Sequence, residues 1–202
     1  MKLYYSPGAS SLATHIVLKE SGLSFEAIAA PTKTHKLADG TDYYRINPLG
    51  YVPYLVLDDG RALHEVAAVV QYLADQVPDK QLAPANGSWE RYKLQEWLNT
   101  IGTELDKGFS LLFTPGMPDE AKEIARTRLI SRLKWVDGEL AGKSFLMGDT
   151  FTVADAYLFV VAGWGKHVGV DISGLGNLSA FVARVAARPA VQDALRAEGL
   201  VK

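Results

Sequence analysis

The sequence predicts an α/β domain of βαβ-ββα order at the N-terminus, followed by an all-helical domain. Short strand patterns alternate with helical stripes up to residue 76, whereas no strand pattern appears after residue 87. The stretch between them, VPDKQLAPANG, concentrates proline, asparagine and glycine, as linkers do. We therefore expect domains at residues 1–76 and 88–202, joined by a linker at 77–87.

Composition narrows the function classes. The chain has 202 residues, 48% of them hydrophobic, with 21 basic and 23 acidic residues and a net charge of -2. No charged block suggests a nucleic acid or a membrane surface as partner, which leaves small molecules or copies of the same chain. No apolar run approaches a membrane span of about 18 residues, so we expect a soluble cytoplasmic protein.

Covalent and metal chemistry are restricted as well. The chain has no cysteine, which excludes disulfides, thiolate metal sites and a cysteine nucleophile. The four histidines lack the spacing of metal ligands, and no glycine-rich phosphate loop is present; they are His15, His35, His64 and His167. No metal is expected.

The first strand is predicted at Lys2–Ser6, and Pro7-Gly8 ends it. Ser10 and Ser11 stand where the next helix begins, and Gly22 ends that helix. These serines have two interpretations. They either cap the helix, or one of them helps to hold an anion such as a thiolate at the positive end of the helix dipole.

A second strand is predicted at Phe25–Ala30, followed by a polar loop at Pro31–Asp42. Loops of this length are often functional. His35 and Lys36 in this loop are either ordinary surface residues or cations that face a carboxylate.

The stretch Asn47–Pro53, NPLGYVP, organises the N-terminal domain. Val52-Pro53 is a candidate cis peptide bond, which would leave the backbone of Val52 free for a peptide-like ligand; a trans proline opening a strand is the alternative. The strand at 54–57, the turn at 58–60 and the strand at 61–63 then form a hairpin. Glu65 opens a helix with an acid in its first turn, as the helix dipole favours.

The C-terminal half reads as a helical bundle. A helix from Ser88 carries one buried stripe, formed by Leu94, Trp97, Leu98, Ile101 and Leu105. A second helix begins after Pro118 and is predicted to be its antiparallel partner. Its single apolar face consists of Ala121, Ile124, Ala125, Leu129, Leu133, Val136 and Leu140.

Thr152 and Asp155 fit a capping box at the start of a helix that is apolar all round and belongs in the middle of the bundle. Residues 181–187 and 191–195 supply the final helices. The second domain is therefore expected to be all-helical.

Six segments in order carry a family resemblance. They are KLYYSPGASSL, INPLGYVP, HEVAAVVQYLAD, ERYKLQEWLN, FTVADAYLF and RPAVQDALRAEGL. Together they cover essentially the whole chain, which resembles a bacterial glutathione S-transferase of the beta class. The resemblance implies a thioredoxin-like first domain, glutathione as co-substrate, a homodimer, and conjugation of small hydrophobic electrophiles in detoxification.

The resemblance also implies roles for single residues. Pro53 matches a proline that is cis in the family, and the backbone at Val52 matches the one that pairs with the cysteinyl part of glutathione. Glu65 matches the acid that holds the γ-glutamyl amine. The Val66 N–H matches the donor that binds the γ-glutamyl carboxylate. His35 or Lys36 would meet the glycine carboxylate. Two further sets are implied: Asn99 and Glu104 near the glutathione site at the dimer interface, and Phe113, Trp164 and Asp106 around the electrophile.

Three positions depart from the family pattern. Ser10 replaces the characteristic cysteine, so mixed-disulfide chemistry is unavailable. Val66 replaces a small residue, and Asp106 replaces a histidine, where a carboxylate would oppose a thiolate.

The leading hypothesis is a transferase in which Ser10, with Ser11 as a substitute, stabilises the thiolate. A weakly catalytic glutathione- or ligand-binding protein and a non-enzymatic scaffold are the alternatives.

Overall fold

The computed structural model describes all 202 residues and divides them into two compact units. Unit 1 is Met1–Leu82 together with Arg188–Lys202, and unit 2 is Ala83–Ala187. The final segment was predicted to belong to the helical domain; it is instead part of unit 1, because its helix α9 (Pro189–Ala197) packs against α1 (Ser11–Ser21). A helical stripe shows which face is buried, not which partner buries it.

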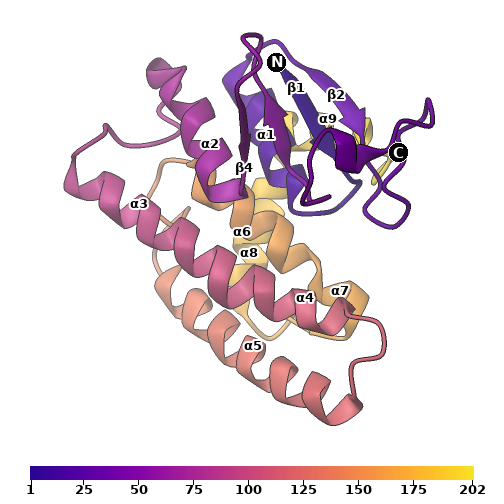
Figure 1. Cartoon of the computed structure of the whole chain (residues 1–202). Helices are drawn as coiled ribbons and strands as arrows, with labels where there is room; N and C mark the ends of the chain where they lie inside the picture. The colour runs from indigo at the N-terminus through magenta and orange to yellow at the C-terminus, as the bar shows by residue number, and fades with distance from the viewer. The chain divides into compact units, whose positions relative to one another are not determined.

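Unit 1 contains a four-stranded mixed sheet in the order β2-β1-β3-β4 (Figure 1). Its strands are β1 (Lys2–Tyr5), β2 (Glu26–Ala29), β3 (Tyr54–Val56) and β4 (Ala62–His64). β1 pairs parallel with β2 and antiparallel with β3, and β3 and β4 form the predicted hairpin. The expected βαβ-ββα unit is confirmed.

Helix α1 lies against both α9 and α2 (Val66–Asp75), and also contacts β1. It is consequently buried on almost every side; Ile16, Val17 and Leu18 are fully inaccessible. Gly22 ends α1 in the left-handed conformation at φ 72°, as predicted. Two single-turn helices complete the unit, η1 (Tyr43–Arg45) and η2 (Pro78–Lys80).

The strand register brings the predicted ligand-binding segments to one edge of the sheet. Tyr54 of β3 is paired with Tyr4 of β1 on one side and with His64 of β4 on the other. Pro53 precedes Tyr54 and Glu65 follows His64, so the two are neighbours across the antiparallel pair. The chain leaves β1 at this same edge, toward Ser10.

Unit 2 is entirely helical. Its helices are α3 (Trp89–Thr100), η3 (Ile101–Asp106), α4 (Lys107–Phe113), α5 (Asp119–Glu139), α6 (Val153–Gly163), α7 (Gly165–Val168) and α8 (Gly176–Ala186). α3, η3 and α4 follow one another without a break and run beside α5 (Figure 1). Trp97 stacks on Trp135, with ring centroids 5.2 Å apart, and Glu104, further along, pairs with Arg128, which confirms an antiparallel arrangement.

One position on α5 was predicted wrongly. Ile124 was expected on the buried face, but 67% of it is exposed. Ala125, Leu129 and Leu133 define the buried face at four-residue intervals. Ile124 precedes Ala125 by one residue, which rotates its side chain by about 100° away from that face.

Helix α6 is the centre of unit 2, with every residue from Val153 to Ala162 buried. Its capping box is confirmed: Thr152 N donates to the Asp155 carboxylate at 2.7 Å. The same carboxylate also accepts a hydrogen bond from Leu146 N at 2.8 Å, so it fixes the preceding loop as well.

None of the helices combines the length and apolar character that a membrane crossing requires.

Candidate functional site

The two serines at the start of α1 have different surroundings. Ser10 is half-buried and makes no side-chain cap bond; its Oγ instead donates to the backbone oxygen of Val52 at 3.3 Å. Ser11 is fully buried, and its Oγ lies 3.1 Å from Ser6 N and 3.3 Å from Ser6 O. Ser11 therefore stabilises the turn after β1, whereas the Ser10 hydroxyl is the one at the sheet edge that carries Val52.

The loop before Val52 is held by buried hydrogen bonds. The Val52-Pro53 peptide bond is cis, as predicted. Tyr51 O accepts two hydrogen bonds, from Tyr43 Oη at 2.8 Å and from Asn47 Nδ2 at 2.9 Å. Burial raises the pKa of Tyr43 to about 12, so its hydroxyl stays protonated and continues to donate across the physiological pH range. The backbone of Val52 is thus presented by a fixed loop.

Gly50 in this loop brings His35 close to it. Gly50 adopts φ 68°, and a Cβ atom there would lie 2.6 Å from the Tyr44 ring and 3.0 Å from the His35 ring. The two rings pack on each other with centroids 4.4 Å apart. His35 Nδ1 is enclosed without a hydrogen-bond partner. Lys36 is exposed and forms a β-bridge with Asp42.

Glu65 has an unusual backbone conformation. The helix was expected to open with Glu65 in its first turn, but α2 begins at Val66 and Glu65 is the N-cap, at φ 66° and ψ 120° without a side-chain cap bond. A non-glycine residue at this φ and ψ is strained, by about 1–3 kcal/mol, and such strain gathers at ligand sites. Glu65 is exposed and Val66 is buried.

A buried network behind the Ser10 loop was not foreseen. His15 Nδ1 lies 2.9 Å from Glu198 Oε1, with both side chains almost wholly inaccessible, and Glu198 Oε2 accepts a hydrogen bond from Gly8 N at 2.9 Å. Burial, and secondarily the charge of Glu198, raise the pKa of Tyr5. The C-terminal segment thereby anchors the turn that leads into Ser10.

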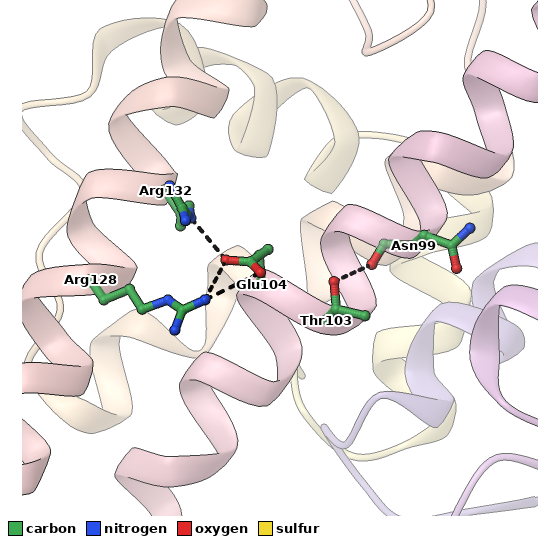
Figure 2. Close-up of polar contacts among 5 residues, drawn as sticks. All are labelled: Asn99, Thr103, Glu104, Arg128 and Arg132. Atoms are coloured by element: carbon green, nitrogen blue, oxygen red, sulfur yellow. Dashed lines mark hydrogen bonds and ion pairs between the residues drawn. The ribbon is translucent and has the colours of Figure 1, made fainter.

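In unit 2, Asn99 lies near the end of α3 and Glu104 lies in η3, the helical segment that continues α3 without a break (Figure 2). Asn99 is exposed, and its Nδ2 donates to Gln95 O at 2.9 Å. Glu104 is bound by Arg132 at 2.9 Å and Arg128 at 3.0 Å. These two guanidinium groups, that of Arg132 first, lower the pKa of the Glu104 carboxyl.

Asp106 ends η3, a π-helical segment in which Lys107 N donates to Gly102 O. Single π-turns often occur at functional sites. Asp106 is only 7% exposed, and its carboxylate accepts a hydrogen bond from Tyr157 Oη at 2.9 Å. Ser110 Oγ donates to the backbone oxygen of Asp106 at 2.9 Å and lies 3.4 Å from the carboxylate.

The predicted electrophile residues form an aromatic cluster. Phe113 of α4 and Trp164, just after α6, meet edge to face with ring centroids 6.1 Å apart. Phe109 packs against the same indole at 5.9 Å. Phe113 is 47% exposed and Trp164 is half-buried, so the cluster opens to solvent at Phe113.

The structure therefore groups the predicted residues within each unit. Unit 1 gathers Ser10, Val52, Pro53 and Glu65 at one sheet edge, with His35 packed against the same loop. In unit 2, Asp106 is bonded to Tyr157 of α6, and Phe113 meets Trp164 two helical turns further along. No group of three or more histidine or carboxylate residues is placed to hold a metal.

Sequence reasoning missed the residues that support these groups. Asn47 and Tyr43 hold the loop, Glu198 holds the turn before Ser10, and Tyr157 binds Asp106. The asparagine of NPLG was a visible turn signal. The other contacts join residues far apart in the chain and leave no local pattern.

Two family models match the chain: the N-terminal domain of glutathione S-transferases over residues 9–76, and their C-terminal domain over residues 89–189. A glutathione S-transferase of Escherichia coli O157:H7, GstA, is 50% identical over 99% of this chain and 100% of its own length. Among solved structures, a beta-class glutathione S-transferase of Sphingomonas chungbukensis is 49% identical, with a TM-score of 0.96 over the whole of both chains. A sphingomonad glutathione S-transferase in complex with glutathione is 46% identical, with a TM-score of 0.95 over the whole of both chains.

These matches span both units and agree with the residues gathered at the sheet edge. The chain belongs to the glutathione S-transferase family, in its bacterial beta class.

Proposed function

We propose that this chain conjugates the thiolate of glutathione to small hydrophobic electrophiles, and that Ser10 supplies the hydroxyl that stabilises the thiolate. The observation that carries this proposal is the position of Ser10 Oγ at the start of α1, 3.3 Å from Val52 O. When glutathione binds, the one hydroxyl hydrogen turns from Val52 O to the thiolate. Ser11 was considered as a substitute, but it is buried and bonded to Ser6, so the proposal rests on Ser10 alone.

The chemistry needs no cysteine, because glutathione brings its own sulfur. The thiol proton passes to solvent, the thiolate attacks the electrophilic carbon, a C–S bond forms and the leaving group departs with the bonding electrons. Lowering the thiol pKa from about 8.5 toward neutrality takes roughly 2 kcal/mol of preferential thiolate binding. One hydroxyl donor and the N-terminus of an 11-residue helix are of the right size to supply this.

Glutathione is assigned to the sheet edge of unit 1. Its cysteinyl backbone pairs with Val52, whose N–H and C=O are presented next to the cis proline. Its γ-glutamyl amine meets Glu65, and the γ-glutamyl carboxylate meets the N–H of Val66 at the start of α2, where helices favour anions. The strained backbone of Glu65 supports this assignment, because strain of this kind is retained where a ligand needs it.

The glycine carboxylate of glutathione is assigned to His35, with Lys36 beside it. The His35 ring is held against Gly50 and Tyr44, so it is positioned without the help of a ligand. Lys36 is exposed and adds a positive charge to the same loop.

The electrophile is assigned to the aromatic cluster of Phe113 and Trp164, with Asp106 beyond it. Phe113 leaves 47% of its surface exposed, which offers an apolar face to a ligand. Asp106 stands where the family has a histidine. Its carboxylate is not exposed on the surface of the aromatic cluster, because the residue is buried and bonded to Tyr157.

A homodimer is part of the proposal, with Asn99 and Glu104 near its interface. Large side chains are exposed on α3 and α5, among them Trp89 at 72%, Tyr92 at 57% and Trp135 at 46%. Exposed aromatic side chains such as these are the type enriched at protein interfaces. Sedimentation of the purified chain tests it, and a monomer across the working concentration range contradicts it. The cytoplasmic location stays a prediction.

The test is calorimetric titration with glutathione combined with turnover of a generic aryl halide. Ser10→Ala should lower the rate by tenfold or more, about 1.4 kcal/mol, because the thiolate loses its hydroxyl donor. Ser24→Ala, an exposed serine of unit 1 away from this edge, is the matched control and should change nothing.

Ser10→Cys distinguishes the alternatives. If the parent binds glutathione without turnover and Ser10→Cys gains disulfide exchange, the chain is a glutathione-binding protein that lacks the reactive thiol. If the parent does not bind glutathione at all, both the transferase and the binding protein are excluded and a scaffold remains.

A further inference from the structure

The backbone of Trp164 is held on both sides along the chain. On the N-terminal side lies the buried helix α6, and Trp164 N donates to Val161 O at 3.2 Å. On the C-terminal side, residues 164–170 include the short helix α7, and we call them the α7 segment. This segment is closed on itself, because Val170 N donates to Gly165 O at 2.9 Å, and both of these residues are buried.

Gly165 has no room for a side chain. A Cβ atom there would lie 2.4 Å from Val170 O, a distance that real Cβ atoms essentially never show, and the clashing atom belongs to the backbone. Gly163, two residues earlier, would place a Cβ atom in open space. An alanine at position 165 therefore has to open the α7 segment, whereas an alanine at position 163 does not.

Arg126 of α5 holds the other end of α7. Its Nη2 donates to Val168 O at 3.2 Å, and its Nη1 pairs with Glu123. Val168 is the last residue of α7, where helix carbonyls have no partner within the helix and attract positive charge. Because the Arg126 side chain is only 27% exposed, this contact is partly shielded from water. Arg126 thus ties the α7 segment to the longest helix of the unit.

The position of the α7 segment affects how the Trp164 ring meets its neighbours. The indole lies nearly perpendicular to the rings of Phe113 and Phe109, at interplanar angles of 88° and 89°. α7 itself packs against α4, the helix that carries both phenylalanines (Figure 1). A shift of this segment moves the backbone of Trp164, so the edge-to-face geometry depends on Gly165 and Arg126.

A ring-bearing electrophile can use this geometry, and a small alkyl electrophile cannot. A flat ring that binds at the exposed part of Phe113 meets aromatic edges and faces whose orientation is fixed before it arrives. A methyl group has no ring to align, so its reaction depends on the thiolate alone. Loss of the Trp164 orientation should therefore weaken the first kind of substrate and spare the second.

We propose that Arg126 and Gly165 are positioning residues, which hold the α7 segment so that Trp164 and Phe113 select ring-bearing electrophiles over small alkyl ones. The proposal rests on the electrophile assignment made above. It goes beyond that assignment because both residues act through Trp164, and because it names the class of electrophile that the site favours.

The first test compares two electrophiles, each with glutathione and each corrected for its uncatalysed rate. In 1-chloro-2,4-dinitrobenzene the thiolate displaces chloride from a ring carbon, and in iodomethane it displaces iodide from the methyl carbon. In Gly165→Ala and in Arg126→Gln, KM for the aryl chloride should rise about three- to tenfold, the value of one aromatic pair. The calorimetric affinity for glutathione and kcat/KM for iodomethane should stay as in the parent. An equal loss with both electrophiles, or an unchanged KM for the aryl chloride, would overturn the proposal.

Each variant has a matched control. Gly163→Ala adds the same methyl group where nothing lies within reach, and Lys134→Gln removes one positive charge from an exposed position of α5. Both controls should keep the parent KM, and a rise as large as in the variants would refute the proposal. If Gly165→Ala is not folded by circular dichroism, Arg126→Gln with Lys134→Gln decides the test, because the Arg126 side chain is partly exposed.

The second test needs neither glutathione nor turnover. The probe is 1,3-dinitrobenzene, which keeps the ring and lacks a leaving group. The chain is labelled with 5-fluorotryptophan, and Trp164→Phe identifies the Trp164 line among the fluorine resonances of the four tryptophans. The probe should shift this line in the parent and bind about three- to tenfold more weakly in Gly165→Ala and Arg126→Gln.

No shift of the Trp164 line in the parent, or equal affinities in the three proteins, would overturn the proposal. Binding that weakens in both variants, in a parent that does not turn over either electrophile, supports the role of the α7 segment while it refutes the transferase proposal.

Discussion

The strained backbone of Glu65 allows stability and ligand binding to be separated with two substitutions. Glu65 adopts φ 66° and ψ 120°, which glycine tolerates and alanine does not. Strain at such a position costs about 1–3 kcal/mol, whereas glycine loses about 0.5–1 kcal/mol relative to alanine through the greater freedom of its unfolded chain. We therefore expect Glu65→Gly to be more stable than Glu65→Ala by about 1–2 kcal/mol.

The two variants should lose glutathione affinity alike, because both lack the carboxylate that is assigned to the γ-glutamyl amine. A charge-assisted hydrogen bond contributes about 1.5–3 kcal/mol, so affinity should fall roughly ten- to hundredfold in each. The side chain is exposed and makes no cap bond, so its removal alone should cost the fold little.

The assays are thermal unfolding without ligand and calorimetric titration with glutathione. For a chain of this length, a difference of 1–2 kcal/mol separates the melting temperatures by roughly 2–8 °C. Glu65→Gly melting at or below Glu65→Ala would show that the backbone there is not strained. Full glutathione affinity in either variant would remove Glu65 from the binding site.

Three further predictions concern the groups that support the site. Glu198→Ala removes the buried hydrogen-bond partner of His15 Nδ1, so urea unfolding should show a loss of about 1–3 kcal/mol. A loss under about 0.5 kcal/mol would contradict a supporting role. The pKa of Glu104 is lowered in the folded state, so its stabilising effect is present above the unfolded pKa and is lost as the pH falls through the folded pKa. Glu104→Gln should therefore flatten the acid side of the profile of stability against pH. An unchanged profile would argue against the pairing with Arg132 and Arg128. The pKa of Tyr43 is raised to about 12, so its contribution to the free energy of unfolding is present below the unfolded pKa of about 10 and is lost as the pH rises through about 12. Tyr43→Phe should remove this loss of stability at alkaline pH, measured by chemical denaturation at a series of pH values. Persistence of the loss would assign it to another group.

Local patterns predicted most elements of this fold. Thr152 and Asp155 stand three residues apart before an apolar run, and Gly22 follows the last turn of α1, so each helix end was visible in the sequence. The hairpin around residues 58–60 was equally visible, because a turn and its two strands are adjacent in the chain.

Long-range contacts were beyond such patterns. His15 and Glu198 are separated by 183 positions, and Asp106 and Tyr157 by 51, so neither pair leaves a periodic signal. For the same reason α9 was assigned to the helical domain, although its buried face meets α1.

The candidate site was predicted from the family resemblance more than from spacing. The geometry at Ser10 then separated two serines that the sequence could not distinguish: Ser11 is enclosed by Ser6, and Ser10 reaches Val52. The backbone of Glu65 is also a finding of the structure, because no residue pattern predicts a positive φ at a glutamate.

The central claim is that Ser10 stabilises the thiolate of bound glutathione, and the pKa of that thiol tests it most directly. Ultraviolet difference titration of the enzyme–glutathione complex measures this pKa in the parent and in Ser10→Ala. We expect the bound thiol to titrate at least one unit below its free value of about 8.5 in the parent, equivalent to about 1.4 kcal/mol, and to return toward that value in Ser10→Ala. A bound thiol with the same pKa in both proteins would contradict the claim.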